Sequence, residues 1–190
     1  AERTMVTFLG IAGKISEKDI DKKAVKESEM IFLEGYLWDE GEPKSAFDKA
    51  LSLGNKTAMS LSDRFCVDRH KQDFLELVKH RLDITFANEQ EITSLIDAKN
   101  FDEIIKFGKQ LKKMVIITRG AKGSVCITDN DVFECEAKKN LKITDLTGAG
   151  DLFASGFLHG YLNNFSTQES LKKGTEMSSK VIQKVGARLN

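Results

Sequence analysis

One short stretch of the sequence, residues 145–151, combines residue types that can handle a phosphate group. Gly148, Ala149 and Gly150 stand directly before a run whose apolar residues recur at helical spacing. Small residues at a helix start leave backbone N–H groups accessible, and the helix dipole favours an anion beside them. Asp151 falls in the first turn, where a carboxylate can take a proton from a hydroxyl that attacks the phosphate. The stretch is therefore a candidate phosphoryl-transfer site, with a simple tight turn before a helix as the alternative.

A second polar segment contains Asn88 and Glu91, which stand three residues apart at an expected helix start. Side chains at this spacing point the same way. An amide and a carboxylate supply oxygen ligands of the kind that Mg²⁺ accepts, often through its waters. The same two residues also form the pattern of a helix capping box, so the sequence leaves a cation site and a cap as open alternatives.

A third segment, residues 118–123, follows an apolar run and contains two glycines and two cations, Arg119 and Lys122. Glycine lets a phosphate approach the backbone closely, and the cations add charge complementarity. Glycines at this spacing are frequent in ordinary connections, so the segment alone identifies no ligand.

The three segments follow expected strands in a chain where apolar strand-like runs alternate with helical patterns. The expected strands cover residues 5–9, 30–33, 57–61, 82–87 and 115–118, and a hairpin joins 124–128 to 132–135. The expected helices cover residues 45–53, 68–80, 88–96, 102–111, 150–162 and 168–185. This alternation predicts an α/β fold with a mostly parallel sheet and an antiparallel edge hairpin. Ligands of such sheets lie beyond the carboxyl ends of the strands, so we expect the three segments to meet.

The composition narrows the classes of function. Lys plus Arg equals Asp plus Glu, at 29 each, which argues against a nucleic-acid or membrane-surface role. No apolar run approaches the roughly 18 residues of a membrane span, and the first residues do not look like a signal peptide. Three widely spaced cysteines suit a reducing compartment, so a cytoplasmic location is expected. Neither a P-loop nor a zinc-protease or serine-hydrolase motif is present.

Together the segments resemble a known family. Residues 145–153 resemble the carboxyl-terminal signature of the ribokinase family, also called PfkB-type carbohydrate kinases. Residues 88–91 resemble its Asn-x-x-Glu element, residues 118–123 its Thr-x-Gly-x-x-Gly nucleotide loop, and residues 180–188 its final helix and Gly-Ala-Arg end. These elements occur in family order over about residues 80 to 190. Residues 34–39 and 60–70 look like the bacterial adenosine kinase-like sugar kinases within the family.

The resemblance implies a ribokinase-like three-layer domain that uses ATP to phosphorylate a hydroxymethyl group of a ribose-like or adenosine-like acceptor. It implies that Asp151 is the catalytic base and that the backbone N–H groups of Gly148, Ala149 and Gly150 form the anion hole. Each remaining role also follows from the match alone: Asn88 and Glu91 organise Mg²⁺, Glu91 through water; Thr118, Gly120 and Gly123 hold the nucleotide; Asp145 and Thr147 bind a monovalent cation, K⁺. Leu146 replaces a threonine of the signature, which puts the K⁺ site in question.

The resemblance also implies that residues 1–190 are the carboxyl-terminal part of a longer kinase domain. The family's amino-terminal signature, with its substrate contacts and most of its lid, has no counterpart in the sequence. We therefore expect a chain that keeps the nucleotide and catalytic loops and shows little turnover by itself. Two alternatives stay open: a truncated nucleotide-binding module without turnover, and an interaction protein that self-associates, for example as a homodimer, through an exposed strand edge.

Overall fold

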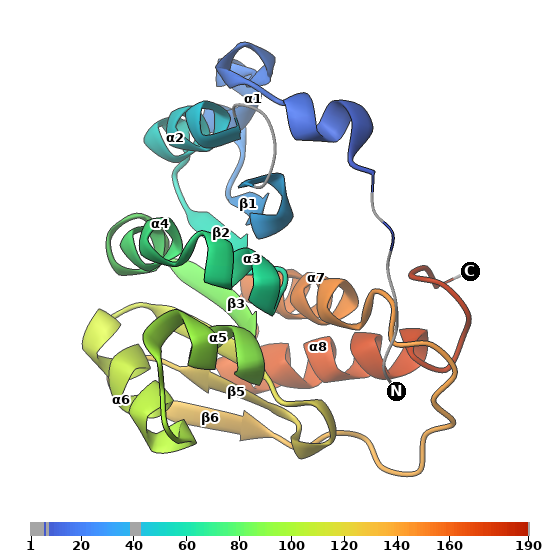
Figure 1. Ribbon diagram of the computed structural model, residues 1–190. Helices are drawn as coiled ribbons and strands as arrows, with labels where there is room; N and C mark the ends of the chain where they lie inside the picture. The colour runs from blue at the N-terminus through green and yellow to red at the C-terminus, as the bar shows by residue number, and fades with distance from the viewer. Residues whose placement is uncertain (1–5, 7, 39–42, 190) are drawn as a thin grey trace.

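The computed structural model of the protein describes residues 6, 8–38 and 43–189. Among these residues, six strands form a sheet in which neighbours follow chain order. Four of them run parallel: β1 (Ile31–Glu34), β2 (Thr57–Ser60), β3 (Ile84–Asn88) and β4 (Met114–Thr118). The hairpin of β5 (Ser124–Ile127) and β6 (Val132–Cys135) adds two antiparallel strands beside β4 (Figure 1). The predicted α/β fold with an edge hairpin is confirmed.

Helices cover both faces of the sheet. One face carries α2 (Pro43–Leu53), α3 (Arg64–Arg69), α4 (Lys71–Glu76), the π-helical turn Leu77–Arg81, α5 (Glu89–Ile96) and α6 (Phe101–Leu111). The other face carries α7 (Ala149–Leu162) and α8 (Thr167–Val181). The short elements α1 (Lys22–Glu27) and the 3₁₀ turns Gly10–Lys14, Glu17–Asp19, Gly35–Trp38 and Gly120–Lys122 complete the described structure. The result is the three-layer arrangement that the family resemblance implied.

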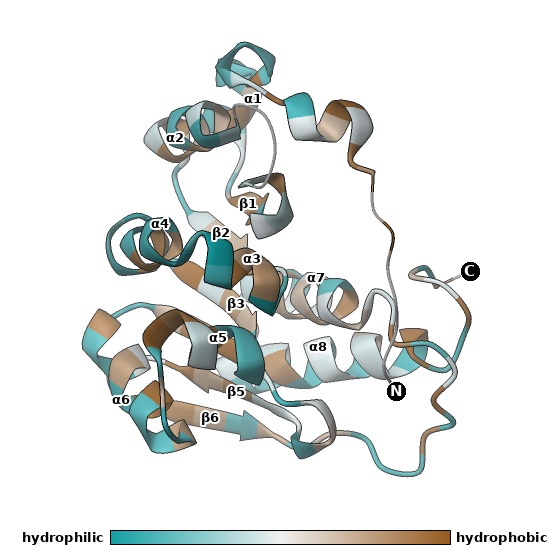
Figure 2. Cartoon of the chain, viewed as in Figure 1, coloured by the Kyte–Doolittle hydropathy of each residue, from teal (hydrophilic) through white to brown (hydrophobic). Residues whose placement is uncertain are grey.

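Alternation along the strands builds the two cores. In β4, Val115 and Ile117 face the α3–α6 layer, whereas Ile116 between them faces α7 and α8. All three side chains are buried, as expected for a parallel strand covered on both faces. Figure 2 shows hydrophobic residues concentrated along the strands and hydrophilic ones over α4. The strands are therefore fixed in position, and so are the loops that leave their carboxyl ends.

Close packing of α7 against α8 fixes the helix that begins at the predicted anion hole. A Cβ atom at Gly156 would lie 2.7 Å from the backbone oxygen of Lys173, and one at Gly174 would lie 2.8 Å from that of Phe153. The helix axes approach this closely because glycine presents no side chain at the contact. The first turn of α7 consequently has a defined place at the edge of the sheet.

Three sequence-based element predictions were wrong in detail. The strand expected over 5–9 does not form at Val6, Phe8 or Leu9, and Met5 and Thr7 lie outside the described residues. Among the described residues, this segment has no neighbouring strand to satisfy its backbone groups, and Val6 and Phe8 are almost fully exposed.

The other two differences concern helices. The helix predicted over 68–80 is divided, because α3 ends at Arg69, α4 begins at Lys71 and a π-helical turn follows Glu76. The first part begins earlier than predicted because the Asp63 carboxylate caps it by accepting the Cys66 N–H at 2.7 Å. The last helix ends at Val181 instead of 185, and the residues after it turn back toward Asp145.

No described helix is long and apolar enough to cross a membrane.

Candidate active site

The structure brings the three predicted loops together at the carboxyl edge of the sheet. Asn88 and Thr118 are register partners at the ends of β3 and β4. A cleft of about 1160 Å³ is lined by Asn88, Thr118 and Gly120, and a neighbouring cleft of about 590 Å³ runs from Thr118 and Gly120 to Ala149 and Gly150. Because the two clefts share Thr118 and Gly120, an elongated ligand can contact all three loops.

The loop before α7 packs against residues 186–187, which follow the last helix. The Asp145 carboxylate accepts the Thr147 N–H at 2.9 Å and the Gly186 N–H at 2.8 Å. Gly148 has a φ of +77°, and a Cβ atom there would lie 2.8 Å from the Cβ of Ala187. Only glycine fits this left-handed and crowded position without strain. The Gly-Ala pair at 186–187 therefore supports the turn from which α7 begins.

The first turn of α7 opens toward the smaller cleft. Nothing lies within 4 Å of a Cβ atom built at Gly150, so the space above its backbone is free. The Ala149 N–H donates to the Leu146 carbonyl oxygen at 3.2 Å, which engages one of the three predicted anion-hole donors. A bound phosphate would have to share or displace that hydrogen bond.

The loop after β4, residues 118–123, also leaves open space at one of its glycines. Gly120 has a φ of +57°, and a Cβ atom there would have no neighbour within 4 Å, whereas a Cβ atom at Gly123 would lie 2.1 Å from the Cys135 backbone oxygen. Gly123 is thus required by packing against β6, and Gly120 leaves room for a ligand. The loop closes on itself through the Arg119 N–H, which donates to the Gly123 oxygen at 2.8 Å.

Asn88 and Glu91 form the capping box that the sequence left as an alternative. Asn88 Oδ1 accepts the Glu91 N–H at 2.9 Å, while Glu91 Oε2 and Oε1 accept the Asn88 N–H and Nδ2–H at 2.8 and 2.5 Å. Glu91 is buried, with 4% of its surface exposed. Burial raises the pKa of this carboxyl to about 7, against the hydrogen bonds from Asn88, and the charges of Asp63 and Glu34 raise it further.

Glu34, which the sequence indicated only within residues 34–39, is a further carboxylate at this edge of the sheet. It ends β1, and its burial and the nearby charge of Asp151 raise its pKa to about 7, although the Ser62 hydroxyl donates to it at 3.4 Å. Asp151 itself is exposed in the first turn of α7 and lines neither cleft. The signal for Glu34 was the rule already applied to the other loops, a polar residue directly after an apolar strand.

These carboxylates fit a hydrated cation better than a directly bound one. The charge of Asp151 raises the pKa of Glu34, and the charges of Asp63 and Glu34 raise that of Glu91, so a positive charge near Glu34 and Glu91 would offset this repulsion. The part of the chain that the structure describes has no group of three or more His, Cys, Asp or Glu placed to hold a metal directly. Mg²⁺ keeps several of its waters in proteins, so Asn88 and Glu91 suit a magnesium ion held through water.

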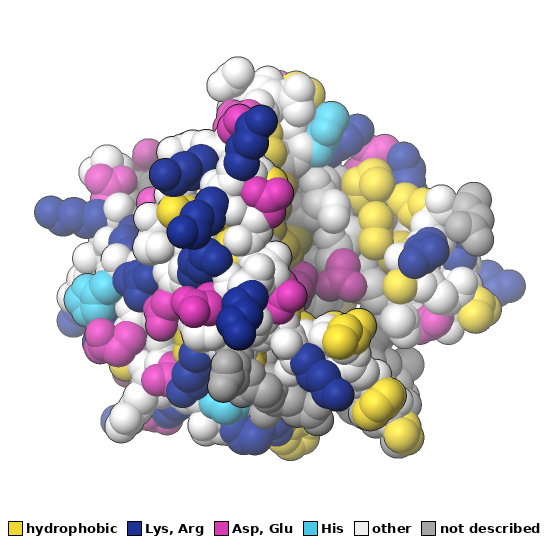
Figure 3. Space-filling model, turned by 90° about the horizontal axis from the view of Figure 1, so that it is seen from above, with side chains coloured by type: hydrophobic (Ala, Val, Ile, Leu, Met, Phe, Trp, Pro, Cys, Tyr) yellow, Lys and Arg dark blue, Asp and Glu magenta, His cyan; other side chains and the backbone are white. Residues whose placement is uncertain are grey.

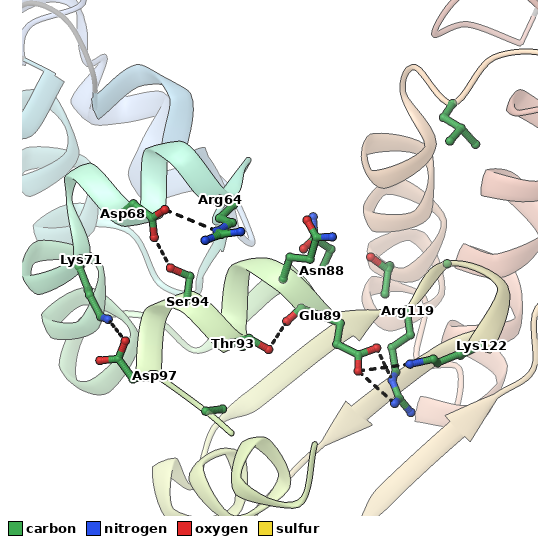
Figure 4. A pocket seen from close by; sticks show the side chains of 15 residues that line it. Arg64, Asp68, Lys71, Asn88, Glu89, Thr93, Ser94, Asp97, Arg119 and Lys122 are labelled. Carbon is green, nitrogen blue, oxygen red and sulfur yellow. Dashed lines mark hydrogen bonds and ion pairs between the residues drawn. The ribbon is translucent and has the colours of Figure 1, made fainter. Parts of the chain in front are cut away.

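Charged and polar pairs line the larger cleft, as Figure 4 shows. A partly buried ion pair joins the loop at 118–123 to α5, with Arg119 Nε 3.0 Å from Glu89 Oε2. Lys122 approaches the same carboxylate at 3.6 Å. The sequence pattern indicated the two cations but not Glu89 as their partner.

The chain has a helix that begins at glycines, at the carboxyl edge of a parallel sheet, and a second glycine-containing loop lies beside it. In folds of this kind, phosphate groups bind to the backbone N–H groups of such loops. The model of the pfkB family carbohydrate kinases matches residues 1–190, and the chain belongs to this family. The predicted family is thereby confirmed.

Three comparisons describe the similarity. A cytidine kinase from Thermococcus kodakarensis is 38% identical over 122 residues, which are 61% of this chain and 42% of that protein. The crystal structure of adenosine kinase from Sinorhizobium meliloti superposes with a TM-score of 0.90 at 35% identity, covering 93% of this chain and 56% of that one. A putative ribokinase II from E. coli, solved with ATP and Mg²⁺, has the same fold, with a TM-score of 0.81 at 20% identity over 90% of this chain and 58% of that one. The chain spans about half the length of the curated relatives it matches.

Proposed function

We propose that residues 1–190 form the carboxyl-terminal, nucleotide-binding and catalytic part of an ATP-dependent kinase for a sugar or nucleoside. The acceptor group is a hydroxymethyl on a ribose-like or adenosine-like molecule. The observation that carries the proposal is the meeting of Gly120 and Gly150 across one cleft, each with open space where a side chain would be. Family membership and the names of the similar proteins support it.

In this proposal the nucleotide lies in the smaller cleft. Its volume of about 590 Å³ is within the range of small-ligand sites. Leu141, Ile143 and Ile182 supply apolar walls for a base, and Thr118, Gly120 and Gly123 form the end near the phosphates. The phosphate chain then points along the first turn of α7.

Asp151 is the proposed general base. Its carboxylate takes the proton of the acceptor hydroxyl as the oxygen attacks the γ-phosphorus, and the bond from that phosphorus to the β-phosphate oxygen breaks to release ADP. The N–H groups of Gly148, Ala149 and Gly150 stabilise the negative charge on the transferring phosphoryl group. The charge of Asp151 acts on the carboxyl of Glu34, which ends β1.

A bound Mg²⁺ would supply positive charge that offsets the charge of the phosphate groups. Asn88 and Glu91 would hold it through its waters, because their own hydrogen bonds already fix their positions. A K⁺ ion at Asp145 and Thr147 stays a prediction. There the Asp145 carboxylate accepts two backbone N–H groups, and Leu146 contributes no hydroxyl.

The alternative function is a nucleotide-binding module without turnover. The favouring observation is the exposure of aromatic side chains at the ends of β1 and β2, where an acceptor would be enclosed: Phe65 exposes 72% and Tyr36 exposes 36% of its surface. A cytoplasmic location and self-association as a homodimer likewise stay predictions.

Calorimetric titration of the 190-residue chain with a non-hydrolysable ATP analogue and Mg²⁺ tests the proposal. We expect saturable binding that weakens when Mg²⁺ is removed. Absence of binding would overturn the nucleotide site. Binding by the chain together with acceptor phosphorylation by the complete protein would support the kinase, and binding with no turnover in the complete protein would support the alternative.

A further inference from the structure

The pairing of β3 with β4 places two oppositely charged residues beside each other at the mouth of the larger cleft. Asn88 and Thr118 are the last register partners of the two strands. The next residues, Glu89 and Arg119, leave the sheet in different directions, Glu89 into α5 and Arg119 into the nucleotide loop. Figure 4 shows their side chains turned toward each other across this divergence.

The Arg119 side chain is held by two partners, Glu89 and Phe101. Its Nε and Nη2 donate to Glu89 Oε2 and Oε1 at 3.0 and 3.3 Å, which is a two-pronged contact of the kind that only a guanidinium makes. Its Cζ lies 3.5 Å from the centre of the Phe101 ring at the start of α6. The side chain keeps only 19% of its surface exposed, and the Arg119 contact holds the pKa of Glu89 below its usual value. Arg119 therefore ties the nucleotide loop to both α5 and α6.

The backbone of Arg119 also closes that loop. Its N–H donates to the Gly123 oxygen at 2.8 Å, and its carbonyl accepts the Lys122 N–H at 3.1 Å. A side chain fixed by Glu89 and Phe101 thus determines where Gly120 and Gly123 lie. Because Asn88 caps the helix in which Glu89 is the first residue, the magnesium-organising pair moves with the nucleotide loop.

Lys122 shares the Glu89 carboxylate but is held much more weakly. Its Nζ makes one contact with Glu89, at 3.6 Å, and 66% of its side chain is exposed. An anion that enters the cleft can draw Lys122 away, and Glu89 then still keeps its two hydrogen bonds from Arg119. The two cations on one carboxylate are therefore suited to different tasks.

We propose that Glu89 and Arg119 are positioning residues that join the nucleotide loop and the Asn88–Glu91 turn into one rigid unit, while Lys122 is the mobile cation that turns to the bound phosphates. This inference rests on the proposed kinase function for its ligand. The unit makes magnesium and nucleotide binding cooperative, since ordering one of its two loops also orders the other.

The first experiment tests, without any ligand, whether the Glu89–Arg119 contact holds the loop at 118–123 in place; this contact is called the clamp below. Hydrogen exchange of the amides of residues 119–123 is followed in the 190-residue chain and in Arg119→Ala, Glu89→Gln and Arg81→Ala. Arg81 stands just before β3, at the end of the strand opposite to Glu89, and its Nη1 lies 3.0 Å from Asp48 Oδ1. Arg81→Ala therefore removes a paired arginine far from the loop and is the matched control. We expect faster exchange of the Lys122 and Gly123 amides in the first two variants only. Unchanged exchange in both would overturn the clamp, whether or not nucleotide binds.

The second experiment measures the coupling. The affinity for a non-hydrolysable ATP analogue is determined with Mg²⁺ and with EDTA, and the ratio of the two dissociation constants reports the cooperativity. We expect Arg119→Ala and Glu89→Gln each to reduce this ratio about fivefold or more, and the double variant to reduce it no further. Arg119→Lys should not restore it, because an ammonium can neither chelate both oxygens nor stack on Phe101.

Lys122→Ala separates the two roles. We expect this variant to weaken binding of the ATP analogue by a similar factor with Mg²⁺ and with EDTA. The ratio of the two dissociation constants would then be unchanged. Equal ratios in the wild type, Arg119→Ala and Glu89→Gln would overturn the positioning role while the kinase proposal stands. A wild-type chain that binds no analogue would overturn the kinase proposal, and the exchange experiment would then decide the clamp alone.

Discussion

The two sides of the candidate active site are built very differently. On the nucleotide side, the loops at 118–123 and 145–151 are fixed by hydrogen bonds and by glycines packed against backbone, for example Gly123 on β6 and Gly148 on Ala187. On the side that would face an acceptor, near the ends of β1 and β2, large side chains such as Phe65 lie exposed. The face seen in Figure 3 is hollowed, with acidic side chains in the hollow and hydrophobic ones along one wall.

This difference separates two requirements of a kinase. Phosphate binding depends on backbone donors, which a sheet and a helix start can fix by local contacts alone. Acceptor binding needs enclosure, which removes water and orients the hydroxyl. Within the described residues the start of α7 offers candidate donors for the first requirement, whereas the exposed Phe65 and Tyr36 leave the second without enclosure, so we expect nucleotide binding and turnover to separate in this chain.

The largest effect is expected for Asp151→Asn in a complete kinase that contains these residues. The amide keeps the size of the side chain but cannot accept the hydroxyl proton, so turnover should fall by about 10² to 10⁴. Affinity for ATP should hold or rise, because a negative charge near the γ-phosphate is removed. Steady-state kinetics and calorimetry on the same preparation check both parts. Near-normal turnover would exclude Asp151 as the base, and loss of ATP binding alone would give it a structural role at the start of α7.

A matched pair of glycines tests how the nucleotide side is built. Gly148→Val should destabilise the chain, by about 1–3 kcal/mol for the left-handed backbone alone, and further through overlap with Ala187. Gly150→Val meets no protein atom within 4 Å, so the melting temperature should stay close to wild type. Its side chain should instead block the donors and cost on the order of 3 kcal/mol of nucleotide affinity.

Thermal unfolding and titration with an ATP analogue distinguish the two glycine variants. If Gly150→Val binds the analogue as well as wild type does, the first turn of α7 is only a turn and not an anion site. If Gly148→Val keeps wild-type stability, the packing of Gly148 against Ala187 is not what fixes the loop before α7.

The free energy of unfolding should depend on pH through the protonation of two carboxyl groups, those of Glu34 and Glu91. The pKa values of Glu34 and Glu91 are raised to about 7 in the folded chain, above their usual value of 4.5. The folded state therefore binds more protons than the unfolded state between these values. Their contribution to stability is complete below about pH 4.5 and is lost as the pH rises through 7. Each carboxyl can contribute at most about 1.4 kcal/mol per pH unit within this window.

Denaturant unfolding between pH 5 and pH 8 measures this slope. Glu34→Gln removes one of the two groups and should flatten the curve, and added Mg²⁺ should restore stability at pH 8 if a cation offsets the charges. A chain that becomes more stable as the pH rises over this range would contradict the raised pKa values.

Much of this site could be predicted from the sequence, because its parts follow local rules. Strand–helix alternation predicted the sheet, and the rule that ligands lie beyond strand carboxyl ends placed Asn88, Gly120 and Asp151 on a common side. The Glu89–Arg119 contact could not be predicted, because it depends on the register of β3 against β4, which no local pattern encodes. The strand expected at 5–9 failed for the related reason that a strand exists only with a partner.

The smallest effect is expected for Phe65, on the acceptor side. Its side chain is 72% exposed at the start of α3, so Phe65→Ala removes few contacts within this chain. The free energy of unfolding should change by less than about 0.5 kcal/mol, as for most exposed positions, and affinity for an ATP analogue should not change. In a complete kinase the same substitution should raise KM for the acceptor and leave KM for ATP as it was. Chemical denaturation and calorimetry on the 190-residue chain, followed by kinetics on the complete protein, separate these outcomes. A clear loss of stability or nucleotide affinity in the 190-residue chain would show that Phe65 supports the loops of the nucleotide side. The proposed difference between the nucleotide side and the acceptor side would then be wrong at this residue.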